Sequence, residues 1–216
     1  MTYLQKNPTN STVNRQTPML SITSRSYELY NNQFGIKPAS YAKGGKGAQI
    51  GYAIRDSPLG RLMVAVTEHG ICFLSLGEDQ RMIAELEKEF SLAEILADEI
   101  VPGEWVREVI ACLEGQKTRP NLPLDVRGTA FQRRVWHELM QIPAGITRTY
   151  SELAESISGK ASARRAVARC CATNPVFLVI PCHRAVRSDG GLGGYRWGLN
   201  RKRALICAEL AWRDDA

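Results

Sequence analysis

Apolar residues gather in three short segments of the first half of the chain, at residues 50–54, 62–67 and 71–76. The segments are rich in residues that favour strands, and the turn-forming stretches 57–60 and 68–70 separate them. Short runs of this kind joined by tight turns predict an antiparallel meander. Further along, apolar positions at helical spacing predict two helices followed by an extended stretch, at about 79–90, 103–114 and 122–126.

From residue 128 onward the apolar positions keep a helical spacing. The pattern predicts four helices, at about residues 131–140, 151–157, 163–173 and 200–212. The second and third are short and closely joined, and the third carries Arg165 and Arg169 four residues apart. This arrangement resembles a helix-turn-helix, a common DNA-binding motif.

The first part of the chain has a different character. Residues 1–20 are rich in Asn, Thr, Gln and Ser, which predicts a disordered lead. A short helix capped by Ser24 is expected over 24–33, and the Lys- and Gly-rich stretch 43–47 indicates a linker. We therefore expect a lead and linker over residues 1–48, an α/β domain over 49–127 and a helical domain over 128–216.

Composition narrows the class of protein. The 216 residues are 44% hydrophobic and 23% charged, enough for one or two globular domains with their own cores. The six cysteines show no CxxC spacing, and neither an N-terminal apolar leader nor a membrane-length apolar run is found. We therefore expect a cytoplasmic protein with free thiols and no contact with a membrane.

The net charge of +6 is unevenly distributed. Residues 1–48 carry 6 basic and 1 acidic side chains, residues 49–120 carry 7 and 13, and residues 121–216 carry 15 and 8. A basic C-terminal part behind an acidic one points to a polyanionic partner such as DNA. A solvated basic face with no partner is the alternative that charge alone leaves open.

The strongest chemical signal is Cys182. It lies in the stretch 180–184, which reads Ile-Pro-Cys-His-Arg and directly follows the apolar run 176–179. Because the thiolate is the nucleophilic form, a neighbouring imidazole and cation favour a reactive cysteine. His183 is the candidate base, acting through a water. Glu209 lies among apolar residues of the last predicted helix and is the candidate that orients the imidazole, although a surface-facing acid is the alternative.

Several motifs in a fixed order then resemble the O6-alkylguanine-DNA alkyltransferases. They are Phe131-Gln132-Arg133-Arg134-Val135-Trp136, Ile142-Pro143-Ala144-Gly145, Thr149-Tyr150, Ile180-Pro181-Cys182-His183-Arg184 and Gly194-Tyr195-Arg196-Trp197-Gly198. The resemblance covers about residues 49–212 and is strongest over 128–210. It implies a small N-terminal ribonuclease-H-like α/β domain with antiparallel strands, followed by a helical, winged helix-turn-helix-like domain that binds DNA and holds the active site.

The resemblance also implies a reaction. Cys182 would take the alkyl group from O6 of guanine, and also a methyl group from O4 of thymine, in a single displacement and keep it, so that each molecule acts once. His183 would take the thiol proton and Glu209 would stabilise the imidazole. Tyr150 would donate a proton toward N3 of the departing guanine, and Asn174 would bridge the DNA-binding helix and the cysteine segment. No cofactor and no metal ion are expected.

The partner implied by the resemblance is double-stranded DNA, bound through its minor groove by a monomer that flips the damaged base out of the stack. Arg165 would fill the gap that the base leaves, and the small Ala166 would permit close approach. Without the resemblance, the arginines of this helix would be read as a solvated face. The other residues expected at the substrate or DNA are Arg164, Arg169, Arg184, Tyr195, Gly193 and the backbone carbonyl of Val179.

Three further expectations follow. Trp197 is bulky where a smaller residue would open the pocket, which predicts a preference for methyl over benzyl adducts. Residues 24–45 resemble the end of an AraC-type DNA-binding domain, which some family members carry ahead of the alkyltransferase part. Two other functions remain as alternatives, a lesion-binding protein that transfers nothing and a transcription regulator acting through residues 1–48; the presence of Cys182 argues against the first.

Overall fold

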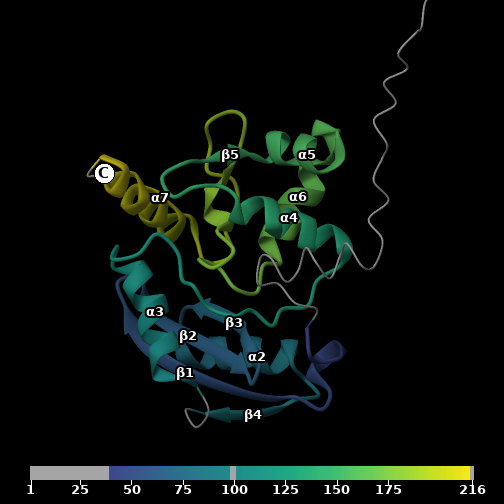
Figure 1. Cartoon of the computed structure of the whole chain (residues 1–216), viewed down its shortest axis with the longest axis vertical. Coiled ribbons are helices and arrows are strands. Elements are labelled where there is room, and N and C mark those ends of the chain that lie inside the picture. The colour runs from purple at the N-terminus through teal and green to yellow at the C-terminus, as the bar shows by residue number, and fades with distance from the viewer. Residues whose placement is uncertain (1–38, 98–100, 215–216) are drawn as a thin grey trace, which may run out of the picture.

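The computed structural model describes residues 39–97 and 101–214, with side chains up to residue 211. Figure 1 shows a sheet domain and a helical domain stacked along the long axis of the molecule. The strands are β1 (Gln49–Ser57), β2 (Gly60–Thr67), β3 (Gly70–Leu76), β4 (Glu94–Ala97), β5 (Arg148–Thr149) and β6 (Ala185–Val186). The helices are α2 (Asp79–Glu89), α3 (Gly103–Leu113), α4 (Ala130–Met140), α5 (Tyr150–Ser158), α6 (Arg164–Ala172) and α7 (Leu199–Asp214). The helix expected over 24–33 lies outside the described residues.

The sheet domain is a four-stranded sheet in the order β3-β2-β1-β4. β1 pairs with β2 and β2 with β3 in antiparallel register, which confirms the meander, while β4 joins β1 in parallel. Residues 62–66 of β2 are all buried because both faces of the sheet are covered. On one face Met63 packs with Met82 of α2, and on the other Val64 shares a core with Val109 of α3 and with the helical domain.

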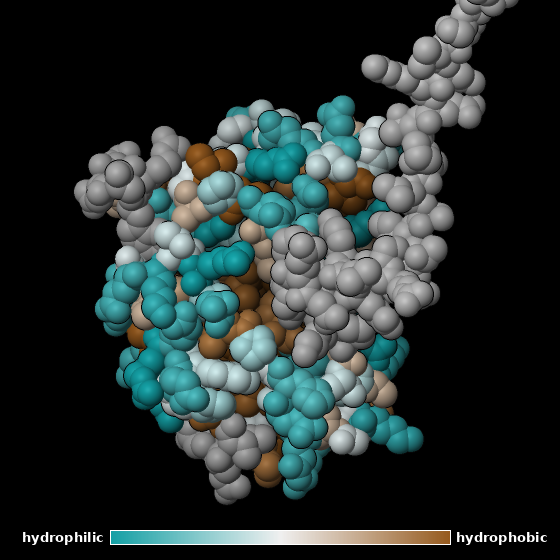
Figure 2. Space-filling model, viewed as in Figure 1, coloured by the Kyte–Doolittle hydropathy of each residue, from teal (hydrophilic) through white to brown (hydrophobic). Residues whose placement is uncertain are grey.

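The two domains share that second core. β3 is an edge strand, and segments of the second half of the chain cover its edge. The backbone N–H of Ile71 donates to the carbonyl of Pro123 at 2.9 Å, and that of Leu74 donates to the carbonyl of Pro175 at 2.8 Å. The otherwise open edge of β3 is thereby covered by the stretch around Pro123 and by the segment that leads from Pro175 to Cys182. In Figure 2 apolar side chains are visible in the hollow between the domains, beneath a mostly hydrophilic surface.

The helical domain begins its helices with strong local signals. Thr129 and Thr149 cap α4 and α5, and each forms a capping box with the Gln or Glu three residues later. Gly159 ends α5 in the left-handed conformation, at φ 67°, and a short 3₁₀ turn, Ala161–Ala163, leads into α6. The short α5–α6 pair has the arrangement that the sequence predicts for a helix-turn-helix.

Two parts of the fold differ from the sequence-based expectation. Within residues 43–47, expected to be a linker, Gly44 and Gly45 pack against the sheet domain instead, while Lys43, Lys46 and Gly47 are exposed. Gly45 is buried, and a Cβ there would lie 2.8 Å from that of Ala93, so the glycine permits close approach rather than flexibility. β4, β5 and β6 are strands that the pattern did not predict. In the described part of the chain no helix is long and apolar enough to cross a membrane.

Candidate active site

Cys182 begins a buried 3₁₀ turn, Cys182–Arg184, and its side chain is 2% exposed. The segment before it is tightly folded, since the Cys182 N–H donates to the Ile180 carbonyl at 2.7 Å and the Val179 N–H donates to that of Phe177 at 2.8 Å. Leu178 between them has φ 68°, a conformation that non-glycine residues rarely adopt. The backbone thus fixes where the sulfur lies.

Asn174 holds the segment from behind. It is fully buried at the end of α6, where its side-chain N–H donates to the Ile180 carbonyl at 2.8 Å and its oxygen accepts from the Val176 N–H at 3.0 Å. Its side chain therefore ties the chain after α6 to the backbone just ahead of Cys182. Both hydrogen bonds join residues of the stretch 174–180, so the bridge to α6 that the resemblance implies stays a prediction.

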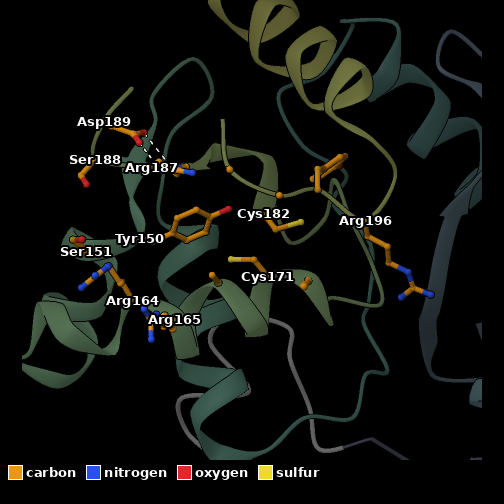
Figure 3. A pocket seen from close by; sticks show the side chains of 15 residues that line it. Tyr150, Ser151, Arg164, Arg165, Cys171, Cys182, Arg187, Ser188, Asp189 and Arg196 are labelled. Carbon is orange, nitrogen blue, oxygen red and sulfur yellow. Dashed lines mark hydrogen bonds and ion pairs between the residues drawn. The ribbon is translucent and has the colours of Figure 1, made fainter. Parts of the chain in front are cut away.

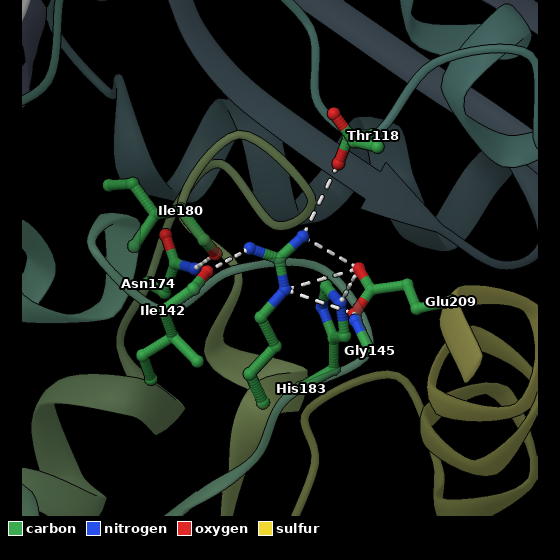
Figure 4. Close-up of polar contacts among 8 residues, drawn as sticks. Thr118, Ile142, Gly145, Asn174, Ile180, His183 and Glu209 are labelled. Atoms are coloured by element: carbon green, nitrogen blue, oxygen red, sulfur yellow. Dashed lines mark hydrogen bonds and ion pairs between the residues drawn. The ribbon is translucent and has the colours of Figure 1, made fainter. Parts of the chain in front are cut away.

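The imidazole of His183 and the carboxylate of Glu209 meet in the interior. His183 is 0% exposed, and its Nε2 lies 2.8 Å from Oε1 of Glu209, which α7 brings to this point. The same carboxylate accepts from Nε and from a terminal nitrogen of Arg184, the latter at 2.8 Å, and from the N–H of Gly145. Figure 4 shows the guanidinium between Glu209 and the carbonyls of Ile142 and Thr118.

The cluster sets the protonation states. Burial alone would raise the pKa of Glu209, but hydrogen bonds from His183 and Arg184 outweigh it and lower that pKa to about 2. Burial lowers the pKa of His183, and Glu209 offsets this only in part because the charges of Arg184 and Lys202 lower it further. At neutral pH the carboxylate is therefore ionised and the imidazole neutral. With Nε2–H donated to Glu209, Nδ1 is the nitrogen left to accept a proton, and no described side chain occupies it.

Burial also raises the pKa of the Cys182 thiol to about 11, although the Asn174 amide and the charge of Lys202 both act to lower it. The thiol is consequently protonated at rest and needs a base when it reacts. Lys202, on α7, is fully buried, and its ammonium donates to the carbonyls of Ala185 and Leu192. Sequence reasoning missed Lys202, because nothing in the pattern of α7 distinguishes it from its exposed neighbours.

A pocket of about 910 Å³ opens onto Cys182. Figure 3 shows the Tyr150 hydroxyl pointing toward Cys182 from the start of α5, and Cys171 of α6 near both side chains. Burial is the main cause that raises the pKa of Tyr150, and the charges of Cys171 and Cys182 raise it further. The phenol therefore stays protonated. The opposite wall contains Gly193, where a Cβ would lie 2.8 Å from the Tyr150 ring, so only glycine lets the wall lie this close to the tyrosine.

The mouth of the pocket is formed by the N-terminal end of α6. Arg164 and Arg165 both line it and are exposed, whereas Ala166 and Arg169 are exposed on the same helix but do not line it. The buried side of α6 is apolar and packs on α4 and α5. The exposed face of α6 therefore combines three arginines with a small residue next to an opening that leads to the thiol.

Two expectations are wrong in detail. Arg184, expected at the DNA, is 4% exposed and bound to Glu209, because burial of the carboxylate requires a compensating charge. Trp197, expected to narrow the pocket, does not line it and is 6% exposed beneath Tyr195. Tyr195 lines the pocket as expected. Val179 is buried and does not line the pocket, so binding of the base by its carbonyl stays a prediction.

Among the described residues, no cluster of His, Cys, Asp or Glu is suited to hold a metal ion.

Comparison with known proteins matches both domains to one family. The model of the 6-O-methylguanine DNA methyltransferase DNA-binding domain matches residues 130–211, and that of the ribonuclease-like domain matches residues 50–126. The chain is 44% identical over 188 residues to the bifunctional transcriptional activator and DNA repair enzyme Ada of Escherichia coli, covering 87% of this chain and 53% of that protein. It thus spans about half the length of this relative.

Other relatives are matched over most of their length. The methylated-DNA–protein-cysteine methyltransferase of Mycobacterium bovis is 41% identical over 160 residues, which cover 73% of this chain and 90% of that protein. The crystal structure of the Mycobacterium tuberculosis protein in complex with DNA aligns with a TM-score of 0.64 at 35% identity, over 74% of this chain and 93% of that one. By sequence and by fold, the chain belongs to the O6-methylguanine DNA methyltransferase family.

Proposed function

We propose that this protein repairs DNA by moving a methyl group from O6 of guanine to the sulfur of Cys182, once per molecule. The observation that carries the proposal is the position of Cys182, at the inner end of a pocket with arginines at its mouth and with the His183–Glu209 pair behind it. The name of the Mycobacterium bovis relative and the DNA complex of the Mycobacterium tuberculosis protein support the same reaction.

The chemistry begins with the thiol proton. His183 takes it at Nδ1, through a bridging water, and becomes an imidazolium that the ionised Glu209 stabilises. The sulfur of Cys182 then forms a bond to the methyl carbon as the bond from that carbon to O6 breaks, and the electron pair stays with guanine. Tyr150, held protonated by burial, donates toward N3 so that guanine does not leave as a bare anion. A thioether is not displaced by water at useful rates, so the protein is spent.

The base must leave the stack to reach a sulfur that is 2% exposed. We infer that α6 lies in the minor groove, where Ala166 permits close approach and Arg165, at the mouth of the pocket, fills the space of the extruded base. Arg164 and Arg169, exposed on the same helix, then meet backbone phosphates. Tyr195 and Gly193 form the wall along which the flipped base lies.

We further infer that the protein acts as a monomer in the cytoplasm, without a cofactor. A single chain supplies the nucleophile, the base, the proton donor and the basic face. The net charge of +6 supports retention on a polyanion such as DNA.

The test uses duplex DNA with a labelled methyl group on O6 of one guanine. The wild-type protein and Cys171→Ala are expected to take up the label, because Cys171 lines the pocket without a base of its own. Cys182→Ala is expected to take up none while still binding the duplex. Failure of the wild-type protein to take up label would leave the alternative of a lesion-binding protein, and label on Cys182→Ala would reject Cys182 as the acceptor.

A further inference from the structure

The pocket wall opposite α6 belongs to the loop that follows β6. Arg187, Gly193 and Tyr195 of this loop line the pocket. Its last residues turn away from the thiol, and Figure 3 shows Arg196 extending away from Cys182 and Tyr150 toward the neighbouring domain. The loop is therefore attached at a point outside the helical domain that holds the catalytic cluster.

Arg196 binds the sheet domain through charge and stacking. A terminal nitrogen of its guanidinium lies 3.1 Å from Oε2 of Glu85 on α2, and the two side chains are 29% and 26% exposed. The guanidinium also lies 5.5 Å from the ring centroid of Phe73 on β3, within the range of a cation–π contact. Half-burial makes this pair stronger than a solvated surface ion pair.

Trp197 adds a second attachment beside the first. Its indole N–H donates to the hydroxyl of Ser75 on β3 at 3.2 Å, and that hydroxyl donates to Oε2 of Glu85 at 3.5 Å. The indole also lies edge-on to the Tyr195 ring, with 5.2 Å between ring centroids. Tyr195 is thus backed by a side chain that the sheet domain holds in place.

The same strand also holds the other side of the pocket. Leu74, next to Ser75 on β3, donates its N–H to the carbonyl of Pro175 at 2.8 Å, at the start of the segment that leads to Cys182. Adjacent residues of one strand therefore anchor the nucleophile segment and the loop that forms the opposite wall. Relative movement of the two walls requires one of these anchors to break.

We propose that Arg196 is a positioning residue, which fixes the spacing between Tyr195 and Cys182 by binding the loop to Glu85 and Phe73 of the sheet domain. The inference rests on the proposed alkyl transfer and assigns to the acidic sheet domain a specific part in it. The proposed action of Arg196 runs through Tyr195 and the loop. Its charge also acts to lower the pKa of the Cys182 thiol, an effect that Glu85→Gln leaves in place while it releases the loop. The competing role is direct binding of a DNA phosphate, since its side chain is partly exposed at the pocket.

Variants of both partners separate the two roles. Arg196→Met and Glu85→Gln are compared with wild type for the maximal single-turnover rate of methyl transfer at saturating duplex, and for affinity toward undamaged duplex at several salt concentrations. A positioning role predicts that both variants lower the maximal rate by about five- to tenfold and leave affinity and salt dependence unchanged. Arg196→Lys, which keeps the charge but loses the planar stacking, is expected to recover part of the rate.

Two controls isolate the contact. Arg81→Met removes the other ion-pair partner of Glu85 while leaving Arg196 in place, and Arg203→Met removes an exposed arginine of α7. Both are expected to react at the wild-type rate. The inference is overturned if Glu85→Gln reacts like wild type, or if Arg196→Met lowers the salt slope by about one, the mark of a lost phosphate contact. A wild-type protein that transfers no methyl would instead reject the proposed function.

Discussion

The buried cluster behind Cys182 and the exposed face of α6 serve one proposed reaction but are built in opposite ways. In the cluster, His183, Arg184 and Glu209 are each at most 4% exposed and are joined by contacts of 2.8 to 3.2 Å. On α6, Arg164 and Arg165 are exposed beside the pocket. One region fixes charges in place inside the protein, and the other presents them to a partner.

The difference determines what each region can contribute. Inside the protein a charge without its partner costs several kcal/mol, so the cluster couples chemistry to stability. In the free protein a surface arginine is solvated in both the folded and the unfolded state, so its loss affects binding and base flipping but not folding. Substitutions in the two regions should therefore separate into two classes of effect.

The largest effect is expected in the cluster, from Glu209→Gln. The amide cannot stabilise the imidazolium and leaves Arg184 without its buried counter-charge, so the rate of methyl transfer should fall about 100- to 1,000-fold. Thermal unfolding should occur at a lower temperature as well. Glu87→Gln, an exposed acid of α2, is the matched control and should change neither quantity. A Glu209→Gln rate within threefold of wild type would remove the carboxylate from the mechanism.

Acid pH should weaken the same cluster without any mutation. The pKa of Glu209 is lowered from 4.5 to about 2 in the folded protein. Its contribution to stability is therefore complete above about 4.5 and is lost as the pH falls toward about 2. The shift corresponds to about 3 kcal/mol. Denaturant unfolding of wild type and Glu209→Gln at a series of pH values measures this contribution as the difference between their free energies of unfolding. A difference that does not shrink below pH 4.5 would contradict the lowered pKa of Glu209.

A smaller effect, confined to activity, is expected for Arg165→Ala. Loss of the side chain that would replace the flipped base should slow transfer from duplex DNA about 10- to 100-fold, and transfer from single-stranded DNA by much less, because no stack then needs to be filled. The unfolding temperature should not change. Arg119→Ala, an exposed arginine of the loop after α3, is the control. Equal losses on both substrates would show that Arg165 acts on the reaction and not on the duplex.

The smallest effect is expected for Arg169→Ala. This exposed side chain lies on α6 outside the pocket, so its loss should weaken binding to damaged and undamaged duplex alike, by a few-fold, and reduce the salt slope by about one. The maximal transfer rate should be unchanged. Titration of a fluorescent duplex at several salt concentrations gives the slope, and an unchanged slope would place α6 in a different orientation on the DNA.

Much of the fold could be predicted from the sequence because the pattern and the burial agree. The alternating or continuous apolar runs became β1, β2 and β3, and the helical runs became α2 to α7. β4 was missed because its four residues are at most half-buried and carry no alternation. The packing of Gly44 and Gly45 was not predicted because glycine permits both flexibility and close approach, and only the packed neighbours show which one applies.

The candidate site divides in the same way. Cys182 and His183 could be proposed because an imidazole next to a cysteine favours a reactive thiolate. Glu209 could be proposed because an acid among apolar residues needs a partner. The burial of Arg184 against Glu209 could not be predicted, since the sequence shows the charge of Arg184 but not whether its side chain turns inward. Lys202 was missed because its partners are backbone carbonyls, which no side-chain pattern reveals. Arg196 was missed because its partner Glu85 lies in the other domain, far away in the sequence.

The most direct test of the account locates and counts the transferred methyl groups. The protein is incubated with excess duplex carrying O6-methylguanine, and peptide mapping by mass spectrometry is followed to the plateau for wild type and for Arg165→Ala. We expect one methyl group per chain on Cys182 in both, reached more slowly by Arg165→Ala, because the buried cluster performs the chemistry and the exposed face delivers the base. Methyl on another residue, or more than one methyl removed from DNA per chain, would contradict the account.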